Sequence, residues 1–131
     1  ILIFASDYLK IKTFYESYDK TKARIGGDFY RAGGGTEILP PTKEALKLLM
    51  AATGDFERSL IIISDFAIAG DEEKFAELIN EAMSRQIHPI LISLQGLDPE
   101  IPGASFIRIN SIRDLIPVFF DIYRAAIGGG R

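Results

Sequence analysis

An aspartate at the end of the most apolar stretch of the chain is the residue best placed for chemistry. Residues 59–64 read Ser-Leu-Ile-Ile-Ile-Ser, with no polar alternation, and Asp65 follows them. Such a run predicts a central strand that is buried on both faces of a parallel sheet covered by helices. Open α/β sheets bind their ligands at the carboxyl ends of the strands, so we expect Asp65 at a functional site.

A hydroxyl group that follows three glycines is the second candidate. Residues 33–36 read Gly-Gly-Gly-Thr, and a helical pattern begins after Pro40 and Pro41. Glycines let the backbone approach a ligand closely, and they leave the Thr36 hydroxyl exposed just before a helix. By themselves the glycines are more typical of a turn that binds nothing.

The sequence lacks the motifs of the common catalytic sites. It contains no Gly-x-x-x-x-Gly-Lys-Ser/Thr phosphate loop and no Gly-x-Ser-x-Gly elbow, and it has one histidine and no cysteine. The absence of cysteine excludes a thiol nucleophile, a disulfide and a cysteine metal site. We interpret His88, beside Pro89, as structural, and we expect no enzyme.

Length and composition indicate one globular domain over residues 1–131. The chain is 47% hydrophobic and 25% charged, and its net charge of -3 gives no basic surface for nucleic acid or an anionic membrane. The absence of cysteine favours a cytoplasmic location. Because the first residue is Ile1, we expect that the chain begins inside a longer protein.

The order of the predicted elements indicates an α/β fold with a doubly wound, mostly parallel sheet and helices on both faces. On the last helix, Phe119, Phe120 and Tyr123 have the spacing of core residues, and Ser111 with Asp114 predicts its cap. Gly54 is expected to cap the first helix. The predicted strands cover residues 1–5, 8–15, 60–65, 88–94 and 105–109, and the predicted helices cover 45–52, 71–85 and 111–127.

Two stretches of the sequence resemble metal-site segments of a von Willebrand factor A domain. The second segment is similar to residues 33–38 with the helix after them, and the third is similar to residues 60–65 followed by Gly70-Asp71. The resemblance covers roughly residues 33–127, and residues 1–31 resemble the second and third strands of that family. It implies a three-layer, Rossmann-like sheet with a metal-ion-dependent adhesion site at its upper edge. In this family the matching threonine and aspartate bind Mg²⁺, which assigns Thr36 and Asp65 as metal ligands.

The resemblance also implies a function. A carboxylate of a partner protein replaces a water on Mg²⁺ or another divalent cation, so the site holds proteins together without breaking bonds. Prokaryotic domains of this family are often companions of AAA+ ATPases, which suggests such an ATPase as the partner.

One motif of the family is missing. No Asp-x-Ser-x-Ser segment occurs in the sequence, and the positions after Asp7 hold Leu9 and Ile11 where oxygen ligands are needed. Residues 1–5 therefore match the second strand of the family, and its first strand and first helix are expected upstream of Ile1. The intact protein is expected to bind metal, whereas this chain binds it weakly or not at all.

A missing central strand leaves the N–H and C=O groups along two strand edges without partners. Such groups are not buried without hydrogen bonds. We expect the gap to be closed by direct pairing of the strands at residues 1–5 and 60–65, or by a strand of another chain through self-association.

An alternative function is a signalling receiver domain with Asp65 as the phosphoacceptor. A receiver needs a lysine after its last core strand, and Leu94-Gln95-Gly96 contains none.

Overall fold

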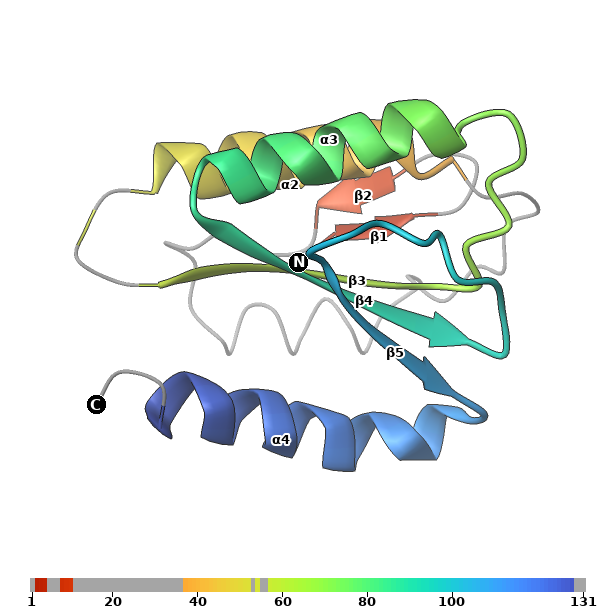
Figure 1. The fold of residues 1–131 in the computed structure, drawn as a ribbon, viewed down its shortest axis with the longest axis vertical. Helices are drawn as coiled ribbons and strands as arrows, with labels where there is room; N and C mark the ends of the chain where they lie inside the picture. The colour runs from red at the N-terminus through yellow and green to blue at the C-terminus, as the bar shows by residue number, and fades with distance from the viewer. Residues whose placement is uncertain (1, 5–7, 11–36, 53, 55–56, 129–131) are drawn as a thin grey trace.

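The computed structural model describes residues 2–4, 8–10, 37–52, 54 and 57–128 (Figure 1). These residues form a two-stranded antiparallel sheet and a three-stranded parallel sheet, with three α-helices. The strands are β1 (Leu2–Phe4), β2 (Tyr8–Lys10), β3 (Arg58–Ser64), β4 (Ile87–Leu94) and β5 (Ser105–Ile109). The helices are α2 (Leu39–Ala51), α3 (Glu72–Ser84) and α4 (Leu115–Gly128), with a 3-10 turn, η1 (Ile112–Asp114), before α4.

The predicted α/β fold with a parallel sheet is confirmed. Strands β3 and β4 pair in parallel from Arg58 opposite Ile87 to Ser64 opposite Ser93, and β5 pairs in parallel with the other edge of β4. The predicted central place of β3 is wrong within the described sheet, whose order is β3-β4-β5. Ile61 of β3 is 39% exposed.

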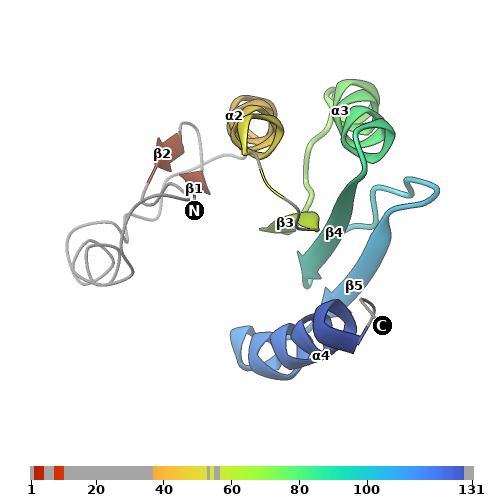
Figure 2. The same ribbon diagram turned by 90° about the vertical axis from the view of Figure 1, so that its left-hand side faces the viewer.

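Alternate residues of the parallel strands pack on opposite sides of the sheet. Leu60 and Ile62 of β3 belong to a core with Phe75 and Ile79 of α3. Ile90 and Ile92 of β4 point the other way, into a second cluster that α4 covers. Figure 2 shows α2 and α3 on one side of the sheet and α4 on the other. Among the described residues, no helix is long and apolar enough to cross a bilayer.

Helix α2 begins earlier and ends earlier than predicted. Its first turn accepts Pro40 and Pro41 because the first N–H groups of a helix need no partner within it. The prediction that Gly54 caps the helix is wrong. Ala52 is the C-cap residue of α2, and its N–H donates to the carbonyls of Leu48 and Leu49 at 3.1 and 3.3 Å. Ala52 is in an extended conformation, so no left-handed residue is needed there.

Arg58, the first residue of β3, ties the ends of two helices to the sheet. Its guanidinium donates to the Leu49 carbonyl of α2 at 3.0 Å and to the Arg85 carbonyl after α3 at 3.4 Å. Carbonyls at the end of a helix lack partners within the helix and carry partial negative charge, so a cation there is favourable.

The predicted cap before the last helix is confirmed. The Asp114 carboxylate accepts hydrogen bonds from the backbone N–H groups of Ser111 and Asn110, at 3.1 and 3.2 Å. We expect Asp114→Ala to lower the free energy of unfolding by about 1 kcal/mol, because these N–H groups lose their acceptor. Urea denaturation would measure the loss. Asp114→Asn keeps an acceptor oxygen and should cost less, and equal losses for both variants would contradict this role.

The prediction that Phe119 and Phe120 of the last helix lie in the core is wrong. Phe119 and Phe120 are 41% and 58% exposed, and the side chain of Tyr123 lies outside the described part of the structure. The residues that pack against the sheet are Leu115, Val118 and Ile122. Both sets have helical spacing, and the helix is apolar on more than one face, so periodicity alone cannot choose between them.

The predicted direct pairing of the first strand with β3 is also wrong in the described strands. Strand β1 pairs with β2 in a separate antiparallel sheet, from Leu2 opposite Lys10 to Phe4 opposite Tyr8. Closure of the gap by another strand stays a prediction.

Candidate functional site

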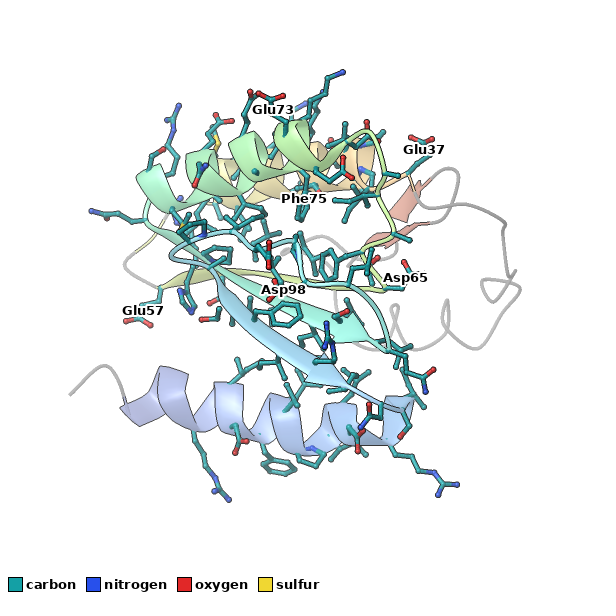
Figure 3. The ribbon with its side chains drawn as sticks, turned by 45° about the vertical axis from the view of Figure 1, so that its right-hand side comes forward. Glu37, Glu57, Asp65, Glu73, Phe75 and Asp98 are labelled. Atoms are coloured by element: carbon teal, nitrogen blue, oxygen red, sulfur yellow. The ribbon has the colours of Figure 1, made fainter. Side chains whose placement is uncertain are left out.

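Asp65 lies where the sequence places it, directly after β3 at the carboxyl end of the parallel strands (Figure 3). The residue is exposed. Its Oδ1 atom accepts a hydrogen bond from the backbone N–H of Ala67 at 3.0 Å. Within the described residues this is the one hydrogen bond of the carboxylate, so the Oδ2 atom can meet a ligand from solvent.

The backbone turns sharply at the residue after Asp65. Phe66 has φ 54°, a left-handed conformation that is uncommon for a bulky side chain and costs about 1–3 kcal/mol. The Phe66 N–H donates to the Ser64 hydroxyl at 3.0 Å, and the Phe66 carbonyl accepts from Ile68 at 3.0 Å. The ring is only 2% exposed and lies 5.9 Å from the Phe75 ring. Burial of this ring holds the strained turn that presents Asp65.

The loop between β4 and β5 contacts the backbone of Asp65. The Leu97 N–H donates to the Asp65 carbonyl at 2.8 Å, and the hydroxyl of the buried Ser93 donates to the Leu97 carbonyl at 2.9 Å. Gly96 comes so close that a Cβ atom built on it would lie 2.0 Å from the Asp65 carbonyl oxygen. The loop can reach Asp65 only because Gly96 has no side chain.

The sequence interpretation assigned no role to Gly96 or Ser93. Ser93 lies near the end of an apolar strand and Gly96 follows that strand, as many turn residues do, and nothing in their spacing shows that the loop folds back onto β3. The signal that could have found Gly96 is its place at the same edge of the sheet as Asp65, given parallel neighbouring strands.

Other carboxylates near this edge are used by the backbone. Glu72 accepts from the Gly70 N–H at 2.8 Å, and Asp98 accepts from the Glu100 N–H at 2.8 Å. Glu37 is exposed and lies at the same end of the molecule as Asp65 (Figure 3). In the described part of the chain, no three His, Cys, Asp or Glu side chains are grouped to hold a metal ion.

Thr36 and the glycines before it lie outside the described residues, so the second predicted metal ligand has no structural description. Asp7 and Ser6 lie outside them as well. The structure describes Asp65 but not Thr36. That the Thr36 hydroxyl and the Asp65 carboxylate form one metal site therefore stays a prediction.

His88 lies at the opposite end of the sheet, near the start of β4. Its Nε2 atom is 3.1 Å from the Ser105 hydroxyl of β5. This contact joins two neighbouring strands, and it places His88 away from Asp65.

Compared with known proteins, the sequence matches no family model and no curated protein. The resemblance to von Willebrand factor A domains therefore rests on the sequence segments named above.

Proposed function

We propose that this chain is part of a protein-interaction module of von Willebrand factor A type, whose metal-ion-dependent adhesion site includes Asp65 and Thr36. The observation that supports the proposal most strongly is the Asp65 carboxylate. It is exposed at the carboxyl end of a parallel strand, and its backbone carbonyl accepts a hydrogen bond from Leu97 in the loop between β4 and β5. A strained turn follows it, and strain of this kind concentrates at functional sites.

The chemistry of the proposed site follows from its oxygen atoms. Mg²⁺ prefers six oxygen ligands in octahedral geometry and keeps several waters. Asp65 would supply a carboxylate oxygen and Thr36 a hydroxyl, while an Asp-x-Ser-x-Ser segment of the intact protein would supply the remaining protein ligands. A carboxylate of the partner protein, an AAA+ ATPase by family analogy, would replace one water. No catalytic step is required.

The finer architecture belongs to the same proposal. A doubly wound sheet of von Willebrand factor A type would extend the three described parallel strands by further strands at the outer edge of β3. The compatible features are the parallel order β3-β4-β5 and the helix α3 that connects β3 to β4.

A matched pair of aspartate variants tests the metal site. Asp65 and Asp98 are both exposed, and in each the Oδ1 atom accepts from the N–H two residues later. Substitution by asparagine keeps that acceptor and removes the charge. In the intact protein we expect Asp65→Asn to weaken Mg²⁺ binding and Mg²⁺-dependent partner binding at least about tenfold, and Asp98→Asn to change neither. Titration calorimetry and a partner pull-down with and without EDTA measure the two effects.

Thr36→Ala should weaken Mg²⁺ binding in the same assay without unfolding the domain. Equal Mg²⁺ affinity for Asp65→Asn and the parent would refute the assignment of Asp65. For the 131-residue chain alone we expect weak or no binding, because two protein ligands are too few. A micromolar affinity for that chain would contradict the need for the missing segment.

The receiver alternative predicts a different reaction at the same carboxylate. Acetyl phosphate would phosphorylate Asp65, and mass spectrometry would detect the modified residue. The residues that follow β4 and β5, Gln95 and Asn110, are not lysines, which disfavours this alternative.

A further inference from the structure

Strand β5 forms the border of the parallel sheet on the side away from β1 and β2 (Figure 2). Its ladder partner is β4, and the register runs without a bulge through all five residues of β5. The strand contains no lysine and no proline, which commonly protect border strands from pairing with another chain. Apart from its short length and Arg108, β5 therefore lacks the usual protection against a further strand.

The backbone groups of β5 point alternately to its two edges. The Ile109 carbonyl accepts a hydrogen bond from the Gln95 N–H at 2.9 Å, so the backbone of Ile109 faces β4. Because of the alternation, Ile107 also faces β4, whereas Phe106 and Arg108 face the outer edge. In the described part of the chain, no backbone hydrogen bond from a loop or turn reaches Phe106 or Arg108. Each of these two residues therefore presents a donor and an acceptor to a neighbouring strand.

The two faces of β5 are already covered by the rest of the molecule. Phe106 packs against the core on the α3 side of the sheet. On the other face, Ile107 and Ile109 belong to the cluster that α4 covers. A partner that lies flat on β5 would have to displace this packing. The outer edge accepts only a partner that lies beside the strand, and backbone groups in this pattern fit another strand.

The sequence of β5 is complementary to a second copy of itself. When two copies run antiparallel with Ile107 opposite Ile107, Phe106 of each copy lies opposite Arg108 of the other. These are the residues whose backbone groups point outward, so each outward N–H meets an outward C=O. The register also places the Arg108 guanidinium opposite an aromatic ring and not opposite another cation. Within one chain this guanidinium already lies 5.9 Å from the centroid of the Phe106 ring, so the two groups are compatible neighbours.

We propose that β5 pairs with β5 of a second copy of this chain, in an antiparallel ladder centred on Ile107 that joins the two parallel sheets into one. The contact has two-fold symmetry and therefore closes as a dimer, whereas pairing of β5 with a different edge would build an open filament. A ladder of five residues buries little surface, so the dimer forms reversibly at high protein concentration. This inference involves neither Asp65 nor a metal ion, so it can hold or fail independently of the proposed adhesion site.

A single cysteine at the two-fold axis tests the proposal, because the chain contains no other cysteine. In the proposed dimer the two copies of Ile107 have Cα atoms about 4.5 Å apart, a distance that a disulfide spans. The two copies of Ser105, on the same face of β5, lie about 13 Å apart, because each is opposite Ile109 of the other copy. Ile107→Cys and the matched control Ser105→Cys are oxidised with copper phenanthroline. Gel electrophoresis without reductant measures the linked dimer.

We expect Ile107→Cys to form the disulfide-linked dimer at least about tenfold faster than Ser105→Cys. Equal rates for the two variants, or a faster rate for Ser105→Cys, would overturn the proposed register.

Hydrogen exchange of the unsubstituted chain gives a second test that leaves the packing of Ile107 intact. At raised protein concentration, we expect exchange of the Phe106 and Arg108 N–H groups to slow at least about threefold, and exchange along β3 to be unchanged. Arg108→Pro removes one outward N–H and leaves the ladder to β4 complete, a position where border strands tolerate proline. It should abolish the concentration dependence at Phe106. Arg108→Ala keeps the N–H and should retain part of this dependence.

The exchange experiment can overturn the dimer in three ways. Rates at Phe106 and Arg108 that do not depend on concentration would show that β5 stays unpaired. Slower exchange along β3 in place of β5 would show that two copies meet through the other border of the sheet. An unchanged concentration dependence at Phe106 in Arg108→Pro would show that the contact does not use the outer edge of β5.

Discussion

Phe75→Ala is expected to lower the free energy of unfolding by about 3–5 kcal/mol, the largest effect of any substitution proposed for this chain. The Phe75 side chain is fully buried, and it belongs to the core formed by α3, α2 and the strands β3 and β4. Its removal leaves a cavity and also withdraws the ring that lies against Phe66. The turn after Asp65 therefore loses part of the packing that holds its strained conformation.

Phe120→Ala is the matched control, because it removes the same side chain from α4. Phe120 is 58% exposed, so we expect a loss below about 1 kcal/mol in the 131-residue chain. Urea denaturation followed by circular dichroism measures both variants. Similar losses of unfolding free energy for the two substitutions would show that α4 packs on the sheet through a different face.

The second large effect is expected for Gly96→Ala. The added Cβ would lie 2.0 Å from the Asp65 carbonyl oxygen and 2.5 Å from the Asp65 Cα, and both atoms are backbone. Neither can rotate away, so the loop after β4 must move and the hydrogen bond from Leu97 to Asp65 is lost. We expect a loss of about 1–3 kcal/mol, together with displacement of the Asp65 backbone. Thermal unfolding measures the loss, and amide chemical shifts of residues 64–68 measure the displacement.

Gly70→Ala separates this clash from the general cost of replacing a glycine. Gly70 has φ 90° and nothing within 4 Å of the position of an added Cβ. Its substitution should cost about 1 kcal/mol from conformation alone and leave the residues around Asp65 unshifted. If Gly96→Ala were no more destabilising than Gly70→Ala and shifted no resonances near Asp65, the close approach of the two loops would not exist in solution.

The sequence by itself determined the fold class, the order of the helices and strands in residues 37–128, and the exit of Asp65 from a parallel strand. These features depend on local patterns: an apolar run such as residues 60–63 predicts a buried strand, and Asp114 three residues after Ser111 predicts a helix start. Chain direction then fixes which end of a parallel strand a residue leaves.

Only the tertiary structure decided which apolar surfaces are buried and which loops meet. Helix α4 has apolar residues on two faces, and packing on Ile90 and Ile92 selects Leu115, Val118 and Ile122 over Phe119 and Phe120. Likewise, Gly96 meets Asp65 because two loops about thirty residues apart leave the same edge of the sheet. Periodicity describes one element at a time, whereas burial and close approach depend on a neighbour that is distant in the sequence.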